Sequence, residues 1–366
     1  MPADAPFIDA RPRPSGSRGA VAWSRENLFS TPANTLVTVV LASLLVWAGA
    51  AALGWGWVHA VWRADADQCQ AARGIGACWG VIAEKGRLIV LGRYPVGEAW
   101  RPVTATALLL ALVVATGSRR TWGLRLALLW PGVLCVFLWL MGGGAGLSHV
   151  TTDLWGGLPL TVLLTVSSLA LAFPLAIAVA LGRRSTMPAL RTLCTVYVEL
   201  VRGVPLISVL FMASFMFPLF MPPGHSPDVL VRVIVGITLF AAAYMAEIVR
   251  GGLQSVERGQ IEAAASIGLS WWQAQRKIVL PQALAAVVPA IMNNFISLFK
   301  DTSLVTIVSL YELTGALSLA LDSDPDWRPF KIEGYLFIAA IYFAFCFAMS
   351  RYSLRLERRL AAARGR

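Results

Sequence analysis

The stretch that decides the fold is Glu262-Ala-Ala-Ala-Ser-Ile-Gly268-Leu-Ser-Trp-Trp-Gln-Ala-Gln-Arg-Lys-Ile278-Val-Leu280-Pro281, a polar, helix-forming segment between two apolar runs. Its first six residues are good helix formers, and Gly268 can take the left-handed conformation that ends a helix. Ser270 and Gln273 have the spacing of a capping box that starts the next helix. The stretch therefore predicts two short helices that Pro281 closes. Helices this short need a surface to rest on, although an ordinary cytoplasmic loop of a membrane protein is the alternative.

The composition is that of a membrane protein. Of 366 residues, 57% are apolar and only 14% are charged. Several apolar runs reach the length of about 20 residues that a helix needs to cross a bilayer. The runs do not alternate with the period of a strand, which argues against a barrel. The fold class is therefore all-α and integral to the membrane.

About eight transmembrane helices are expected, three in an N-terminal extension and five in a core. The predicted spans are 33–58, 103–117, 124–142, 155–181, 204–221, 229–249, 282–299 and 334–350. We expect a disordered tail over 1–30, the extension with its mixed polar loop (63–101) over 31–150, the core over 151–352, and a basic tail over 353–366. Residues 304–321 are also apolar, and we interpret them as a partly buried or re-entrant segment.

The net charge of +11 does not indicate a nucleic-acid partner, because its distribution follows the membrane topology. With the N-terminus inside and eight spans, the cytoplasmic segments hold 21 basic and 8 acidic residues. The outer segments hold 10 basic and 12 acidic residues. This is the asymmetry of the positive-inside rule, and it predicts that both termini are cytoplasmic.

Cysteine and histidine spacing indicates no metal site. The three histidines lie far apart in the sequence. Cys69 and Cys78 share the polar loop after the first span, where a disulfide and two free thiols are both open alternatives.

The stretch at 262–281 resembles the cytoplasmic signature of the permease subunits of bacterial ABC importers at every defined position. Three more stretches are similar to one branch of that family, the polar amino-acid uptake permeases. They are Glu199-Leu-Val-Arg202-Gly203-Val-Pro205-Leu206, Tyr244-Met-Ala-Glu247-Ile-Val-Arg250-Gly-Gly252 and Phe299-Lys300-Asp301-Thr302-Ser303-Leu304. Val204 stands where the family usually has threonine. The resemblance covers about 155–352, and the preceding spans resemble one of the two permeases of general L-amino-acid importers.

This resemblance implies a five-helix importer core in the bacterial inner membrane, with coupling helices at about 255–281. In the family, these helices dock on a dimer of cytoplasmic ABC ATPase subunits that use ATP and Mg²⁺, while the permease itself binds no cofactor and is not an enzyme. A second homologous permease, expected to be a different chain, completes the pore. A periplasmic binding protein delivers the amino acid, which crosses by alternating access.

The sequence agrees with a need for a separate ATPase. It contains no Gly-x-x-x-x-Gly-Lys-Ser/Thr loop to hold the phosphates of ATP.

The resemblance assigns the ATPase-coupling role to seven residues. Glu262 would contact the ATPase, Ala263 and Ala264 would form a packing surface, and Gly268 would set the bend. The remaining three would anchor the unit to the next span: Ile278, Leu280 and Pro281.

A substrate path is expected on the span that follows. Asn293, Ser297 and Lys300 fall at i, i+4 and i+7, and Asn293 lies about 18 Å along the helix from Pro281. Polar groups at that depth face the bundle interior or a water-filled cavity, or they bridge neighbouring helices. Glu247 is a gate or substrate contact, or it simply pairs with Arg250. The candidate path residues are Tyr244, Glu247, Asn293, Asn294, Ser297 and Lys300.

Two other classes of function stay open at this point. A self-contained secondary transporter or channel often has two similar halves, which 33–142 and 155–350 do not show. A membrane scaffold or signalling protein would not need the signature stretch.

Overall fold

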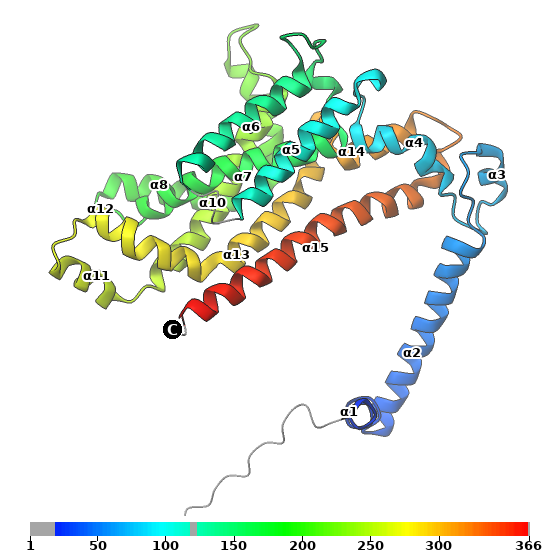
Figure 1. Cartoon of the computed structure of the whole chain (residues 1–366), viewed down its shortest axis with the longest axis horizontal. Coiled ribbons are helices and arrows are strands. Elements are labelled where there is room, and N and C mark those ends of the chain that lie inside the picture. The colour runs from blue at the N-terminus through cyan, green and yellow to red at the C-terminus, as the bar shows by residue number, and fades with distance from the viewer. Residues whose placement is uncertain (1–18, 118–122, 365–366) are drawn as a thin grey trace, which may run out of the picture. The chain divides into compact units, whose positions relative to one another are not determined.

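The computed structural model describes residues 19–117 and 123–364, with side chains up to residue 358 (Figure 1). Every regular secondary-structure element in this part of the chain is a helix. Among the described residues, seven helices are long and apolar enough to cross a membrane, and the number is eight if one bent pair of helices is counted as a span. This agrees with the predicted all-α membrane fold. The chain forms two compact units, Met1–Trp79 and Gly80–Arg366, which are described separately.

The first unit is built on one long apolar helix. It comprises α1 (Ala20–Asn27), α2 (Pro32–Leu53) with a π-helical turn at Gly54–Val58, and α3 (Ala66–Ala71). Thr31 caps α2 by accepting a hydrogen bond from the backbone N–H of Asn34, and Pro32 occupies the first turn. The prediction of a disordered tail is wrong for residues 20–27, which are helical. Its residues 1–18 lie outside the described part of the chain.

Cys69 and Cys78 form a disulfide, with their Cα atoms 5.4 Å apart. Both residues are fully buried in the first unit. Backbone hydrogen bonds join Val61 to the segment beside Cys78, from Val61 N–H to Ala77 O and from Trp79 N–H to Val61 O. Of the two alternatives that the sequence left open, the structure has the disulfide.

The second unit begins with a helix that the sequence analysis missed. Residues 80–91, expected to be loop, form α4 (Gly80–Leu91), which buries Val81 and Ile89. The short 3₁₀ turn Val96–Glu98 leads to α5 (Trp100–Thr116) and α6 (Leu124–Gly142), which match the predicted second and third spans. Helix α4 packs on α7 and α14, and α5 packs on α7. The structure therefore places α4, α5 and α6 in the same compact unit as the core.

The core follows the predicted order of spans. Its elements are the 3₁₀ turn Thr152–Leu154, α7 (Gly157–Gly182), α8 (Pro188–Arg202), α9 (Leu206–Phe211) with turns to Phe220, α10 (Val229–Gln254), α11 (Arg258–Ser266), α12 (Trp271–Ala274), a π-helical turn at Gln275–Val279, α13 (Leu280–Asp301), the 3₁₀ turn Thr302–Val308, α14 (Leu313–Asp322), the 3₁₀ turn Arg328–Phe330 and α15 (Lys331–Arg364). Helices α7 and α10 lie side by side at its centre (Figure 1).

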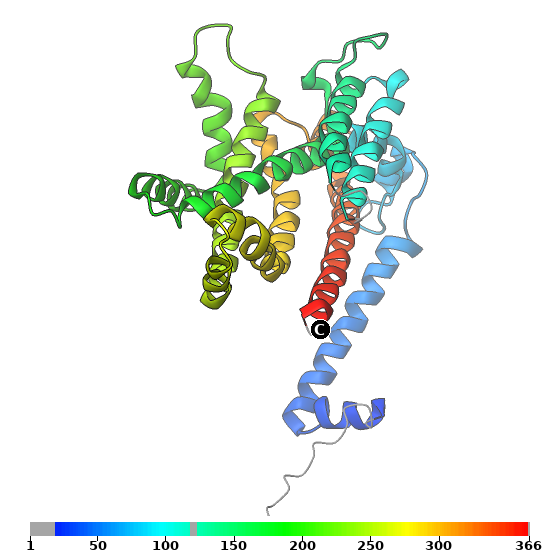
Figure 2. The same cartoon turned by 60° about the vertical axis from the view of Figure 1, so that its left-hand side comes forward.

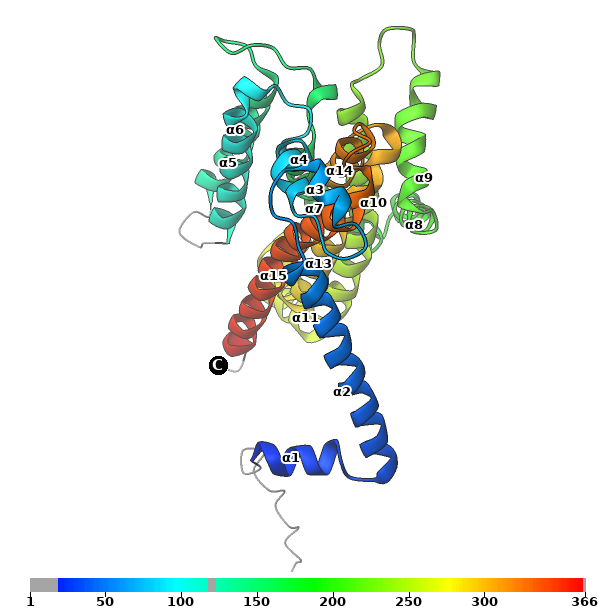
Figure 3. The ribbon, with the colours of Figure 1, turned by 90° about the vertical axis from the view of Figure 1, so that its right-hand side faces the viewer.

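A sharp bend precedes the fifth predicted span, 204–221. Helix α8 and the helical segment Leu206–Phe220 meet at 106°. Figures 2 and 3 show α8 lying across the direction of α9. Gly203-Val-Pro205 separates the two, because Pro205 cannot donate a helical hydrogen bond and its extended backbone (φ −60°, ψ 143°) starts α9 in a new direction.

The apolar segment 304–321 does not span the unit. Helix α14 has only ten residues and buries Leu313, Ala316, Leu317 and Ala320, as expected for a partly buried segment. The buried carboxylate of Glu312 caps it and accepts hydrogen bonds from the backbone N–H of Thr314 and of Gly315, at 2.8 and 3.1 Å, and from the Tyr342 hydroxyl.

Two opposite ends of the second unit can be followed in all three ribbon views. Helices α11 and α12 lie at the same end as the C-terminus of α15, and α4 and α14 lie towards the other end (Figures 1, 2 and 3). At that other end, Lys85 of α4 donates a 2.7 Å hydrogen bond to Asp324 in the loop after α14. The hydrogen bond from the Lys85 ammonium holds the pKa of Asp324 below its ordinary value.

A fully buried arginine holds the loop after α6. Arg101 donates to the carbonyl oxygens of Leu140 and Ser148, at 2.6 and 3.0 Å, and pairs with Glu98. Its guanidinium lies 5.5 Å from the centre of the Tyr94 ring, and burial raises the pKa of Tyr94 to about 12. A cation this buried is tolerated because carbonyls and a carboxylate surround it.

We expect Arg101→Leu to lower the free energy of unfolding by about 3 kcal/mol, because it leaves Glu98 and two carbonyls without their cation. Denaturant unfolding of the full chain in detergent measures this. Arg328→Gln is the control, since the Arg328–Asp322 pair is exposed and 3.5 Å long, and its loss costs less than about 1 kcal/mol. Equal losses in the two variants would contradict the role given to Arg101.

Maleimide labelling of the denatured, unreduced chain is expected to modify three cysteines. Cys135, Cys194 and Cys346 are free thiols, whereas Cys69 and Cys78 are blocked until a reductant is added. Mass spectrometry counts the labels, three before and five after reduction. Five labels without reductant would show that the disulfide does not form in the cell.

Candidate functional site

The polar stretch between the two apolar runs forms two short helices, α11 and α12, joined by a turn. We call residues 258–274 the α11–α12 corner. Helix α11 ends where Gly268 takes a positive φ of 77°, a conformation that glycine adopts without strain. Ser270 then caps α12, accepting from the backbone N–H of Gln273, while the Gln273 side chain accepts from the backbone N–H of Ser270. The predicted bend and the predicted capping box are both present.

The three consecutive alanines of α11, residues 263–265, do not share one face. Glu262 and Ala263 are exposed, whereas Ala264 is buried inside the corner. Ala264 therefore belongs to the packed side of α11, and Glu262 and Ala263 face outward. Of the two alanines expected to form a contact surface, only Ala263 is on the surface of this chain.

The corner continues into the next span without a break. Helix α12, the π-helical turn, α13 and the 3₁₀ turn after it form a single helical segment from Trp271 to Val308, with Pro281 in the first turn of α13. The expectation that Pro281 closes the unit is wrong, because a proline in the first turn of a helix needs no N–H partner. Ile278 and Leu280 are half-buried and Pro281 is exposed. The fully buried contacts at this junction are Val279 and Ala283.

Gly252 sets the distance between α10 and α13 beside the corner. A Cβ atom on Gly252 would lie 2.6 Å from the carbonyl oxygen of Ala283 and 2.9 Å from the Val287 side chain. Only glycine permits this approach. Gly251, next to it, has open space around its Cα. The sequence shows the Gly-Gly pair but does not indicate which of the two is in contact.

The corner carries an exposed aromatic patch that the sequence analysis did not use. Trp271 and Trp272 are 59% and 57% exposed, with ring centres 6.0 Å apart, and Ile267 is 73% exposed. Large apolar side chains grouped in a polar segment mark a contact surface. The signal in the sequence was the Trp-Trp pair itself, since tryptophan is a frequent anchor of protein interfaces.

A network of ion pairs, the Glu247 network, joins α7, α8 and α10. Glu247 binds Arg183 at 2.6 Å, lies 3.8 Å from Arg202, and also pairs with Arg250. Arg183 binds Glu199 at 2.9 Å. The expected Glu247–Arg250 pair is confirmed. Glu199 and Arg202 lie three positions apart on α8, but each has its ion-pair partner outside this helix.

The candidate path residues fall into two groups. Tyr244 lies with the Glu247 network, since the Arg202 guanidinium is 5.7 Å from its ring centre. Asn293, Ser297 and Lys300 follow one face of α13, where Asn293 and Lys300 are exposed and Ser297 is half-buried. Among the described residues no hydrogen bond or ion pair joins the two groups.

Asn294 carries one of the seven buried side-chain atoms that lack a hydrogen-bond partner among the described residues. Its Oδ1 is buried and has no hydrogen-bond partner within the described part of the chain. A buried amide oxygen of this kind is costly unless another molecule supplies a donor.

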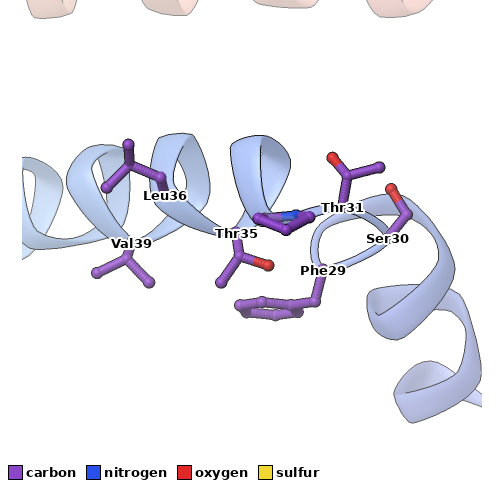
Figure 4. A pocket seen from close by; sticks show the side chains of 7 residues that line it. Phe29, Ser30, Thr31, Thr35, Leu36 and Val39 are labelled. Atoms are coloured by element: carbon purple, nitrogen blue, oxygen red, sulfur yellow. The ribbon is translucent and has the colours of Figure 1, made fainter.

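The cavity beside α1 and α2 offers no chemical site. A shallow pocket of about 600 Å³ lies at the turn between α1 and α2, and Figure 4 shows its lining of Phe29, Ser30, Thr31, Thr35, Leu36 and Val39. These side chains are apolar or hydroxyl-bearing, and none is charged. Over the described residues, no group of His, Cys, Asp and Glu side chains is arranged to hold a metal ion.

The comparisons with known proteins agree on one family. Residues 172–362 match the model of the binding-protein-dependent transport system inner membrane component. The inner membrane amino-acid ABC transporter permease protein YhdY of Escherichia coli K12 is 43% identical over 97% of this chain and 96% of its own length. The glutamate/glutamine/aspartate/asparagine transport system permease protein BztC of Rhodobacter capsulatus is 38% identical, with the same coverage of both chains.

A solved structure described as an amino acid ABC transporter with histidines is 29% identical and covers 56% of this chain and 92% of its own, with a TM-score of 0.49. The family match covers more than half of the chain, and the two relatives align over nearly all of it. The chain therefore belongs to the family of inner membrane components of binding-protein-dependent transport systems.

Proposed function

We propose that the chain is the transmembrane permease subunit of an ATP-driven ABC importer that moves amino acids into the cytoplasm by alternating access. The similarity to two amino-acid transport permeases over 97% of the chain carries this proposal. The exposed α11–α12 corner supports it, because a carrier that works alone has no use for an apolar contact surface outside its spans.

The proposed partners follow from this assignment. A cytoplasmic ABC ATPase dimer binds and hydrolyses ATP with Mg²⁺, a second homologous permease pairs with this chain, and a periplasmic binding protein delivers the amino acid. The absence of a phosphate-binding loop from the sequence supports a separate ATPase. This chain then contributes no catalytic residue and binds no cofactor.

The proposed orientation has both termini in the cytoplasm. The charge asymmetry of the sequence supports it. The ribbon views add that the C-terminus of α15 and the α11–α12 corner lie at the same end of the second unit (Figures 1 and 3). A cytoplasmic C-terminus therefore goes together with a cytoplasmic corner.

The ATPase docks on the outward face of the corner in this proposal. Glu262 and Ala263 give it a carboxylate and a closely approachable backbone, and Trp271 and Trp272 give it apolar anchors. Gly268 sets the angle between the two helices. Ile278, Leu280 and Pro281 lie in an unbroken helix, so a push on α12 reaches α13 directly.

The substrate path is proposed along α13. One face of this helix presents an amide, a hydroxyl and an ammonium group, from Asn293, Ser297 and Lys300. The side-chain oxygen of Asn294 has no hydrogen-bond donor among the described residues. The ammonium of an amino acid is such a donor. Three guanidinium groups surround the Glu247 carboxylate and leave it little capacity to bind the transported amino acid. In this proposal, Glu247 and the nearby Tyr244 hold the helices of the gate in place and do not contact the substrate.

We expect Glu262→Lys combined with Trp271→Ala and Trp272→Ala to abolish copurification of the ATPase, because it reverses a charge and removes both apolar anchors. Detergent pull-down of the full transporter and uptake of radiolabelled amino acids in proteoliposomes measure this. Trp100→Ala is the control, since Trp100 is also about half exposed but belongs to α5. An unchanged pull-down and unchanged uptake would refute the proposed docking surface.

We expect Gly252→Ala to reduce amino-acid uptake more than tenfold, because the new Cβ forces α10 and α13 apart at the corner. Gly251→Ala, which meets nothing within 4 Å, is expected to stay within about twofold of the unchanged chain. ATPase copurification is measured in parallel and should persist in both variants. If both alanine variants transport equally well, the close contact does not transmit motion.

A further inference from the structure

A polar groove of about 410 Å³ opens beside the Glu247 network. Its lining comes from the end of α7, from α8 and from α10, and three of its six residues are arginines. The lining residues are Arg183, Arg191, Thr192, Thr195, Val196 and Arg250. No step of the proposed transport cycle uses this groove.

The groove carries an excess of positive charge. Arg183, Arg202 and Arg250 share the two carboxylates of Glu199 and Glu247. Arg191 is exposed, and its guanidinium has neither a hydrogen-bond acceptor nor an ion-pair partner among the described residues. Four guanidinium groups therefore face two carboxylates, and the unpaired one lies at the rim.

Helix α8 has the form of a helix that lies in a membrane surface. It bends 106° away from the following helical segment, so it does not continue the direction of that span. Leu193, Val196 and Leu200 are apolar and more than half exposed, while Arg191 and Thr192 supply polar groups on the same helix. An amphipathic helix with arginine on its polar side lies at the boundary between headgroups and acyl chains.

We propose that this groove binds the phosphate headgroup of an anionic phospholipid of the cytoplasmic leaflet. Arg191 binds the phosphate, the hydroxyls of Thr192 and Thr195 donate to its oxygens, and the acyl chains lie along Leu193, Val196 and Leu200. Basic pockets between transmembrane helices on the cytoplasmic side suit such headgroups. The proposal rests on the orientation proposed above, but not on the identity of the transported cargo.

The consequence is a lipid-dependent clamp on the Glu247 network. Arg183 and Arg250 line the groove and also hold Glu247. A bound phosphate therefore shares their charge and holds α7, α8 and α10 in one arrangement. Helix α10 leads directly to the α11–α12 corner.

Native mass spectrometry of the delipidated full chain tests the proposal, with dioleoyl phosphatidylglycerol and dioleoyl phosphatidylcholine as probes. We expect the anionic lipid to bind more tightly, and Arg191→Gln to weaken it about fivefold. Arg191→Lys, which keeps the charge, should lose less. Arg351→Gln is the matched control, because Arg351 is an exposed arginine of α15 that does not line the groove.

Three outcomes would overturn the proposal. One is equal binding of the two lipids, and another is an equal loss in Arg191→Gln and Arg351→Gln. The third is displacement of the lipid by millimolar inorganic phosphate or by free amino acids, which would identify a site for small anions. Pull-down of the ATPase by the Arg191→Gln variant is measured separately. Failure of the lipid proposal is therefore distinguishable from failure of the proposed transport function.

Discussion

The close approach of α10 and α13 at Gly252 is the constraint on which the rest of the structure depends. These two helices enter and leave the α11–α12 corner, and the missing side chain lets their backbones meet beside it. Two helices of nine and four residues are marginal on their own, but here they connect two spans that pack closely against each other. A force on the surface of the corner therefore reaches both spans.

The charged groups complete this arrangement on the neighbouring helices. The Glu247 network joins α10 to α7 and α8, so three helices are held together close to where α10 ends. In a membrane, carboxylates and guanidinium groups at helix ends are stable when they are paired. The network therefore links the corner to the long helix at the centre of the unit, and the proposed lipid site acts on the same arginines.

Most spans could be predicted from the sequence because length and apolar content decide them. The ranges 103–117 and 124–142 match α5 and α6 within three residues at each end. Gly268 and Ser270 were also predictable, since their conformations follow from local chemistry. Helix α4 was not, because Glu84, Lys85 and Arg87 interrupt its apolar pattern and its burial depends on α7 and α14.

The contacts that define the site could not be predicted from the sequence, for a different reason. Arg183 and Glu247 are 64 positions apart, and Gly252 meets a residue of another span. Local patterns predict neighbours on one helix, such as Glu247 and Arg250, but give no partner on a distant one. The unbroken helix through Pro281 shows the same limit, since a proline starts a turn as readily as it ends one.

The central claim is that the α11–α12 corner is the surface on which the ATPase acts. Hydrogen–deuterium exchange of the full chain, with and without the purified ATPase subunit, tests it most directly. The account predicts slower exchange in residues 258–274 when the ATPase is added, and no change in α14, which lies towards the other end of the unit. Unchanged exchange in 258–274, with protection elsewhere in the chain, would contradict it.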